Sequence, residues 1–136
     1  MPGTATDPAV RNRAAVLGSP VAHSLSPVLH RAAYDWLRLR WDYEAIEMTP
    51  EGLPEFVRSL DESWAGLSLT MPLKETVLPL LDRIDPVAER IRSVNTVVLD
   101  GPLRKGFNTD VFGILQALRE AHGGLGRPAH GIVVGS

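Results

Sequence analysis

The sequence predicts an α/β domain, a three-layer sandwich around a mostly parallel sheet with one antiparallel hairpin strand. Predicted strands and helices alternate along the chain. The strand segments have alternating or short apolar patterns, and the helix segments have apolar residues at helical spacing. Two consecutive strand patterns are joined by the Asp-Gly-Pro turn at residues 100–102, which is typical of a hairpin. At 136 residues, the chain is long enough to bury the core of one such domain without disulfides.

The first strand and helix are predicted within residues 13–37. Residues 13–18 (RAAVLG) form a short buried strand that ends in glycine. Ser26 suits the N-cap of the following helix, and Pro27 suits its first position. The helix carries an apolar stripe of the kind that packs on a core, formed by Leu29, Ala32, Ala33, Trp36 and Leu37.

A second strand is predicted at residues 42–48, and a third within the stretch GLSLTMPLK at residues 66–74. Thr49 and Pro50 are expected to cap the helix between them. Pro72 lacks a backbone donor and ends the third strand. The inner face of the intervening helix is predicted to contain Leu53, Phe56, Val57 and Leu60.

The second half is predicted to contain two short helices, at residues 75–82 and 86–93, before the hairpin. Asp85 is the expected N-cap of the later helix. The hairpin strands occupy residues 94–100 and 103–108, which places the start of the first beside the end of the second. Thr109 is expected to cap a last helix with one apolar face, formed by Val111, Ile114, Leu115 and Leu118.

These elements divide the chain into three parts. Residues 1–12 are predicted to be a flexible lead-in, because they are rich in proline, glycine and small polar residues. Residues 13–122 form the domain. Residues 123–136 are expected to contain a glycine-rich linker and an apolar strand, HGIVVGS, that stops inside a glycine turn.

Composition excludes several kinds of function. The chain has no cysteine, which excludes thiol catalysis and zinc–cysteine sites and fits a cytoplasmic protein. Its four histidines lack metal-ligand spacing, so we expect no metal site. The net charge of −2 offers no basic surface for nucleic acid. No apolar run approaches membrane-spanning length, and we expect neither a signal peptide nor a membrane partner.

Lys74 is a candidate catalytic residue. Of the 14 lysines and arginines only two, Lys74 and Lys105, are lysines, so arginine provides most of the positive charge. Lysine, unlike arginine, can exchange a proton near neutral pH when its surroundings tune it. Lys74 also follows the end of a predicted strand together with Thr70. The competing interpretation is an ordinary solvated lysine in a turn.

Polar residues follow several strands at the edge where ligands of α/β sheets bind. Ser24 and Ser26 lie at a helix N-terminus, which favours a carboxylate or phosphate, although plain capping would explain Ser26. A carboxylate at Asp110 could hold and tune a lysine for proton transfer. The residues expected to meet at this edge are Ser24, Ser26, Thr70, Lys74, Asn95, Asn108 and Asp110.

Four motifs follow one another along the chain: GSPVAHSLSP at residues 18–27, SLTMPLK at 68–74, VNT at 94–96 and GFNTDVFG at 106–113. In this order they resemble the motifs of the shikimate dehydrogenase family, over about residues 13–136. The resemblance implies the family's N-terminal, substrate-binding catalytic domain and its fold. It also implies an enzyme for the NADP-dependent, reversible reduction of 3-dehydroshikimate to shikimate in aromatic amino-acid and chorismate biosynthesis.

The resemblance also implies roles for single residues. Lys74 would donate and accept the proton at the reacting oxygen, with Asp110 as its partner. Ser24 and Ser26 would bind the substrate carboxylate. The ring hydroxyls would contact Thr70, Asn95 and Asp110, and Ser68 and Asn108 are secondary candidates.

Two features differ from the family. Ser68 stands where the family commonly has asparagine, which leaves one substrate contact open. The glycine loop that would hold the pyrophosphate of NADP does not follow the last strand, so no cofactor-binding residue is expected in this chain. We therefore interpret the chain as the substrate-binding half of a protein about twice as long, inactive by itself.

Three alternatives stay open at this stage. A related enzyme acting on quinate or an aminated shikimate would use the same carboxylate and hydroxyl contacts. A non-catalytic module that binds a small hydroxy acid would not need Lys74. A homodimer is also compatible with the sequence, because the last apolar strand lacks neighbours.

Overall fold

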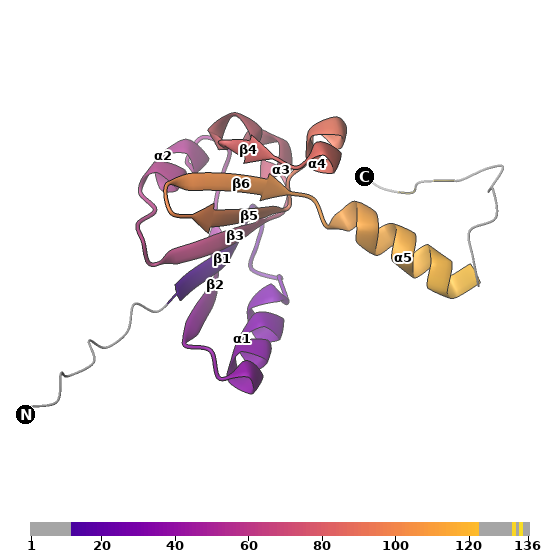
Figure 1. Cartoon of the computed structure of the whole chain (residues 1–136), viewed down its shortest axis with the longest axis horizontal. Coiled ribbons are helices and arrows are strands. Elements are labelled where there is room, and N and C mark those ends of the chain that lie inside the picture. Colours follow the sequence, from indigo (N-terminus) through magenta and orange to yellow (C-terminus); the bar gives the residue numbers. More distant parts are fainter. Residues whose placement is uncertain (1–11, 123–131, 133, 135–136) are drawn as a thin grey trace, which may run out of the picture.

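The computed structural model describes residues 12–122 together with Ile132 and Val134. Its centre is a six-stranded sheet with the strand order β2-β1-β3-β5-β6-β4, visible edge to edge in Figure 1. The strands are β1 (Asn12–Gly18), β2 (Trp41–Glu47), β3 (Trp64–Leu69), β4 (Arg83–Ile84), β5 (Thr96–Asp100) and β6 (Leu103–Phe107).

The direction of the strands confirms the predicted mixed sheet. β1 is parallel to β2 and β3, and β4 is parallel to β6. β5 pairs antiparallel with both β3 and β6, so it is the one reversed strand among the six. Gly101 makes the hairpin turn between β5 and β6 at φ 58°, where a side chain would be strained.

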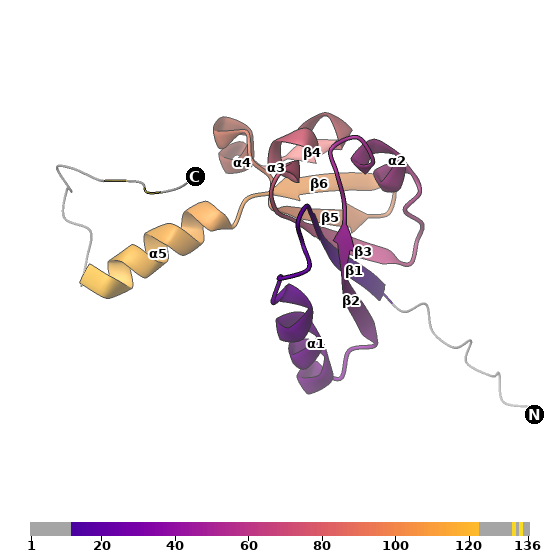
Figure 2. The same cartoon turned by 180° about the vertical axis from the view of Figure 1, so that it is seen from behind.

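The helices lie on the two faces of the sheet. The main core packs α2, α3 and α4 against one face, with Leu17, Leu67 and Leu73 buried at its centre. α1 covers the other face only over β1 and β2, whereas α5 leaves the sheet and projects away from it (Figures 1 and 2). The helices are α1 (Ser26–Leu37), α2 (Leu53–Arg58), α3 (Leu73–Thr76), α4 (Pro86–Ile91) and α5 (Asp110–His122), with a 3₁₀ turn at Leu78–Leu80.

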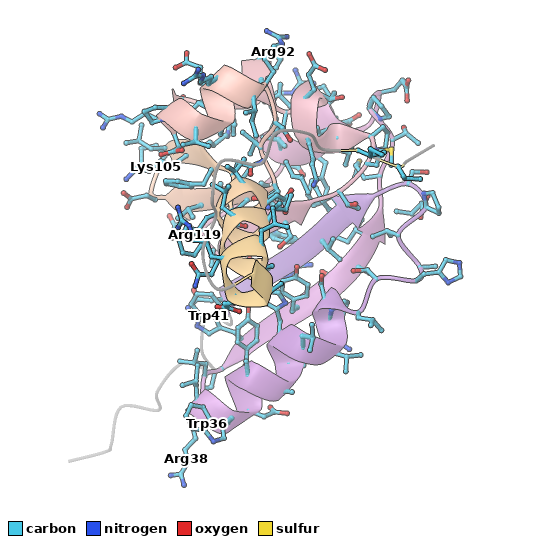
Figure 3. All side chains as sticks on the ribbon, turned by 90° about the vertical axis from the view of Figure 1, so that its right-hand side faces the viewer. Trp36, Arg38, Trp41, Arg92, Lys105 and Arg119 are labelled. Atoms are coloured by element: carbon cyan, nitrogen blue, oxygen red, sulfur yellow. The ribbon has the colours of Figure 1, made fainter. Side chains whose placement is uncertain are left out.

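The prediction that α1 packs through its apolar stripe is wrong. Leu29 is 67% exposed and Trp36 is 83% exposed, and Figure 3 shows Trp36 at the far end of α1. The helix instead turns His30 and Tyr34 toward the sheet, where both rings contact Tyr43 of β2. Aromatic contacts with one buried tyrosine therefore set the rotation of this helix, and the apolar periodicity does not.

The apolar face predicted for α5 is also exposed. Ile114 is 61% exposed, and Leu115 and Leu118 are 40% and 42% exposed. A helix that leaves its sheet has no core of its own domain to pack against. The apolar face was predicted correctly as a pattern, but within the described residues nothing covers it.

Several element ends also differ from the prediction. The N-cap position of α1 is Leu25 rather than Ser26, and α2 begins at Leu53, later than the predicted cap at Thr49. Short β4 was missed, because two residues carry too little pattern to indicate a strand. The cap at Asp85 is confirmed, since its carboxylate accepts the Val87 N–H at 3.0 Å.

The predictions for the two ends of the chain fall mostly outside the described residues. The flexible lead-in was predicted for residues 1–12, but Asn12 already belongs to β1. The linker and final strand predicted for residues 123–136 are not described, apart from Ile132 and Val134, which lie outside any regular element and are 91% and 93% exposed. None of the described helices is long and apolar enough to cross a membrane.

The end of β1 packs closely against the end of β3 through Gly18. A Cβ atom at Gly18 would collide with the methyl group of Thr70 and would lie 3.0 Å from the Met71 carbonyl oxygen. The Thr70 N–H also donates to the Leu17 carbonyl at 2.9 Å. Glycine at this position therefore lets the two strand ends, and the loops that follow them, approach each other.

We expect Gly18→Ala to lower the free energy of unfolding by about 1–3 kcal/mol, because the new methyl group overpacks this contact. Urea unfolding followed by circular dichroism would measure the change. Gly113→Ala is the matched control, because a Cβ atom there meets nothing within 4 Å inside α5. That substitution should stabilise the domain by about 0.5–1 kcal/mol. Equal effects of the two changes would contradict the proposed close approach.

Candidate functional site

A polar cavity of about 540 Å³ opens at the carboxyl ends of β1 and β3, beside the start of α5. The loop after β1, the turn after β3 and the start of the hairpin all contribute to its wall. The predicted convergence of three polar clusters is thereby confirmed. The predicted residues in its lining are Ser24, Ser26, Ser68, Thr70, Lys74, Asn95 and Asp110, and His30, Thr96 and Thr109 join them.

Lys74 and Asp110 form an ion pair at this cavity. The Lys74 Nζ atom donates to Asp110 Oδ2 at 2.6 Å. Lys74 lies in the first turn of α3 and Asp110 in the first turn of α5. The pair therefore joins the starts of two helices through residues that are 36 positions apart in sequence. The side chains are 35% and 45% exposed, which keeps the ammonium group accessible to a ligand.

Asn95 orients the carboxylate of this pair. Its Nδ2 atom donates to Asp110 Oδ1 at 2.8 Å and to the Thr109 hydroxyl at 2.9 Å. Its Oδ1 atom accepts the Thr109 N–H at 3.1 Å and the Thr96 hydroxyl at 3.0 Å. These contacts determine which way the amide points, so both oxygens of Asp110 have a fixed hydrogen-bond donor.

The surroundings keep Asp110 ionised. Burial raises the pKa of its carboxyl group, but hydrogen bonds from Lys74 and Asn95 and the charge of Lys74 outweigh burial, so the pKa lies below its usual value. At neutral pH the site therefore contains a carboxylate and an ammonium group in contact. Such a pair can hold a proton at a defined position beside a ligand oxygen.

The cavity wall at the start of α1 carries the hydroxyl groups of Ser24 and Ser26. Ser24 Oγ accepts the Ser26 N–H at 3.3 Å, where α1 begins. Ser24 therefore caps the helix start, the role that the sequence suggested for Ser26. The positive end of the α1 dipole and these hydroxyls favour a negatively charged ligand group.

Of the predicted site residues, Asn108 lies outside the cavity and Ser68 lies in its wall. Asn108 does not line the cavity, because its amide group donates to the Ser93 carbonyl at 2.9 Å and accepts the Val111 N–H at 3.2 Å. It therefore caps α5, the role expected of Thr109. Ser68 does line the cavity, and its hydroxyl accepts a hydrogen bond from Tyr43 at 2.7 Å.

His30 and Tyr43 were missed by sequence reasoning. His30 lies in the middle of the exposed helix α1, and Tyr43 in the middle of β2, where neither a motif nor a strand end marks them. The signal that could have found His30 is its i, i+4 pair with Tyr34, which places two rings on one face of the helix. No local signal marks Tyr43.

A larger hollow of about 670 Å³ lies at the other end of the strands, by the starts of β1 and β3 and the turn between β5 and β6. Arg104 is the one cation among its described lining residues, and that lining has no hydroxyl group or lysine. Its two carboxylates, Asp61 and Glu62, are exposed, and Asp61 already accepts the Ser63 N–H at 2.9 Å. The smaller cavity is the better candidate site, because a lysine–carboxylate pair and several hydroxyl groups converge there.

Comparison with known proteins shows which family this chain resembles. Residues 16–97 match the family model described as the shikimate dehydrogenase substrate binding domain. The chain is 45% identical over 125 residues to the shikimate dehydrogenase (NADP(+)) of Thermus thermophilus, which covers 91% of this chain and 46% of that protein. The chain spans less than half the length of the curated relatives it matches.

Solved structures share the fold. The Thermus thermophilus enzyme in complex with shikimate has a TM-score of 0.76 at 46% identity, over 80% of this chain and 42% of that one. Shikimate dehydrogenase of Mycobacterium tuberculosis has a TM-score of 0.75 at 42% identity, over 79% and 41%. A 5-ketofructose reductase of Gluconobacter has a TM-score of 0.76 at 27% identity, over 81% and 40%.

We expect Asp110→Asn to reduce stability at neutral pH but not in acid. Because the pKa of Asp110 is lowered in the folded chain, the ionised carboxylate stabilises the fold above the usual pKa of about 4, and this contribution is lost as the pH falls through the lowered value. The difference at pH 7 should be about 0.2–1 kcal/mol, since the pair is partly solvated.

Thermal unfolding between pH 3 and pH 7 would measure it. In a Lys74→Ala background the effect of Asp110→Asn should shrink, because Lys74 provides the first of the hydrogen bonds that lower the pKa. A stability difference that grows on acidification would contradict the expected sign.

Proposed function

Since this chain belongs to the family of shikimate dehydrogenase substrate-binding domains, we propose that it binds shikimate and 3-dehydroshikimate. In this proposal it is the substrate-binding half of an NADP-dependent shikimate dehydrogenase. That enzyme interconverts the two compounds in chorismate and aromatic amino-acid biosynthesis, and we place it in the cytoplasm. Support comes from the names of relatives that are 43–46% identical to the chain.

One observation carries the proposal: the cavity has a charged end and a hydroxyl end. Lys74, Asp110 and Asn95 form the charged end, and Ser24 and Ser26 form the hydroxyl end. Shikimate has the matching division, since it is a cyclohexene ring with a carboxylate on one side and hydroxyl groups on the other. A ligand of that kind satisfies both ends at once.

The hydroxyl end would bind the carboxylate. Ser24 and Ser26 can each donate a hydrogen bond to a carboxylate oxygen, and the start of α1 adds its positive dipole. At the other end, the ring hydroxyls would contact Thr70 and Asn95, which can both donate and accept hydrogen bonds, and the Asp110 carboxylate, which accepts them.

Lys74 would transfer the proton. When the carbonyl of 3-dehydroshikimate is reduced, its oxygen becomes a hydroxyl group and needs a proton, which the Lys74 ammonium group can give. In the reverse direction the neutral amine takes the proton from the hydroxyl group. Asp110 accepts a hydrogen bond from Lys74 at 2.6 Å, so it fixes the position of the nitrogen while the proton moves.

NADP, the cofactor named for the relatives, supplies the hydride in such a reaction. Residues 12–122 do not fit it, because no helix among them opens with the glycine-rich turn that binds a pyrophosphate. We therefore propose that NADP binds outside this domain and that the 136-residue chain alone has no turnover.

Ser68 supports a second candidate, a related enzyme for quinate or an aminated shikimate. Ser68 lines the cavity, and its hydroxyl is shorter than the asparagine amide common at this position, so it would leave more room for a different substituent. The similarity to a 5-ketofructose reductase at 27% identity also indicates that this fold accommodates other hydroxylated ketones. Neither feature changes the requirement for Lys74.

Isothermal titration of the 136-residue chain tests the proposed ligand. Shikimate should bind, more weakly than to a complete enzyme, and NADP should give no heat. Quinate is titrated in parallel. The ligand that binds more tightly indicates whether the chain belongs to a shikimate dehydrogenase or to a related enzyme for quinate. A chain that is folded by circular dichroism but binds neither compound would refute the proposal.

We expect Lys74→Ala to lower the turnover number about 10²–10⁴-fold in a complete enzyme that includes this domain, because a positioned proton donor is lost. KM should change less. Lys105→Ala is the matched control, since Lys105 is the other lysine of the chain and pairs with Asp100 in the hairpin, away from the cavity. Turnover of Lys74→Ala within a few-fold of wild type would show that Lys74 is an ordinary turn residue. Shikimate binding without turnover in the complete wild-type protein would instead favour a non-catalytic binding module.

We expect Ser24→Ala to weaken shikimate binding by about 1–3 kcal/mol, because a charge-assisted hydrogen bond to the carboxylate is removed. An analogue with a hydroxymethyl group in place of the carboxylate should bind both chains equally. Calorimetry with both ligands gives the comparison. An equal loss for the two ligands would assign Ser24 to the structure of the loop alone.

A further inference from the structure

Tyr43 places a buried hydroxyl group directly behind the hydroxyl end of the cavity. Its side chain is 2% exposed and belongs to a small core cluster with Ala14, Val16 and Val21. The phenol oxygen nevertheless contacts a residue that lines the cavity, since it donates to Ser68 Oγ at 2.7 Å. A buried group therefore touches, from outside the cavity, a hydroxyl that faces the ligand.

The direction of the hydrogen bond between Tyr43 and Ser68 follows from the one proton that each hydroxyl group can donate. The Tyr43 hydroxyl donates its one proton to Ser68 Oγ. A phenol is the better donor of the two, and an aliphatic hydroxyl is the better acceptor. Among the described side chains, Tyr43 is the one that hydrogen-bonds to the Ser68 hydroxyl. The Ser68 proton is thus left to point into the cavity.

His30 holds this arrangement from the other side. Its ring stacks on the Tyr43 ring, with centroids 4.0 Å apart and planes inclined by 10°. Its Nδ1 atom lies 2.8 Å from the Ser26 carbonyl oxygen and therefore carries the proton, because a carbonyl only accepts. The same imidazole fixes both the Tyr43 ring and the backbone of Ser26.

We propose that Tyr43 is a positioning residue that directs the Ser68 hydroxyl toward the carboxylate of the ligand, so that Ser68 joins Ser24 and Ser26 as a donor. The inference rests on the proposed function, because it assumes that the carboxylate of shikimate occupies the hydroxyl end. It assigns a role to a residue that does not line the cavity. It also explains how a serine serves where the family commonly has an asparagine, whose amide donates without help.

The opposite direction of the hydrogen bond has a different consequence. If Ser68 donated to Tyr43 instead, the Ser68 oxygen would present lone pairs to the cavity. A carboxylate would then be repelled by Ser68, and Ser68→Ala would strengthen its binding. The two directions therefore predict opposite signs for one substitution.

Calorimetric titration of four chains decides between them: wild type, Tyr43→Phe, Ser68→Ala and the double variant. Each is titrated with shikimate and with the hydroxymethyl analogue that lacks the carboxylate. We expect Ser68→Ala to weaken shikimate binding about tenfold, the value of a hydrogen bond to a charged group. Tyr43→Phe should weaken it about threefold, because the Ser68 hydroxyl stays but loses its orientation and polarisation.

The double variant tests whether Tyr43 acts through Ser68. If Tyr43 acts through Ser68, removing its hydroxyl group has no further effect once Ser68 is alanine, so the double variant should equal Ser68→Ala. The analogue should bind all four chains within about twofold. Tyr34→Phe is the matched control, since Tyr34 contacts the same rings but does not line the cavity, and it should bind shikimate like wild type.

Several results would overturn the inference. Tyr43→Phe with wild-type affinity would do so, as would losses that multiply in the double variant, tighter binding by Ser68→Ala, or equal losses for the two ligands. Thermal unfolding checks that each chain is folded; should Tyr43→Phe not fold, Ser68→Ala with the two ligands still gives the deciding sign. A folded wild-type chain that does not bind shikimate would instead refute the proposed function, which distinguishes the two failures.

Discussion

The hydrogen bonds of Asn95 hold the candidate site together. Its backbone carbonyl accepts the Leu69 N–H at 2.8 Å, and its own N–H donates to the Phe107 carbonyl at 3.0 Å, so the residue lies between the ends of β3 and β6. Its side chain then reaches Asp110 and Thr109 at the start of α5. The end of β3 and the junction between β6 and α5, which are distant in sequence, meet at Asn95, and the position of Asp110 beside Lys74 depends on that contact.

The exposure of the Lys74–Asp110 pair indicates that stability is not the main reason for it. Side chains that are 35% and 45% exposed gain at most about 1 kcal/mol from such a pair, because solvent screens the charges and both side chains lose freedom. The domain buries a core that includes Leu17, Leu53 and Leu73, each fully buried, and this core contributes far more. An accessible pair at the wall of a polar cavity is better explained by the chemistry that it makes available.

The two ends of the cavity are built on different principles. At the charged end, direct ionic contacts and the amide of Asn95 fix the groups. At the hydroxyl end, a stack of His30 on Tyr43 positions neutral groups from behind, and burial raises the pKa of the Tyr43 phenol, although its hydrogen bonds oppose that rise. The second arrangement also accounts for the unexpected rotation of α1, whose ring-bearing face is needed at the sheet.

The sequence by itself determined the features that depend on neighbouring residues. Residues 100–102 indicated the hairpin, Asp85 indicated a helix start, and the position of Lys74 after a strand indicated the edge where it lies. The convergence at that edge followed as well, because parallel strands end on the same side of a sheet. Local backbone preferences and strand direction are enough for such predictions.

Tertiary structure alone decided which face each helix turns toward the sheet and which buried side chains contact the wall of the cavity from outside it. The apolar stripe of α1 predicted burial, but ring contacts with Tyr43 turned it outward. Periodicity shows that a helix has an apolar face and says nothing about which partner it meets. Tyr43 and Ser68 lie 25 positions apart on strands that do not pair with each other, since β1 separates them, so no local pattern could connect them.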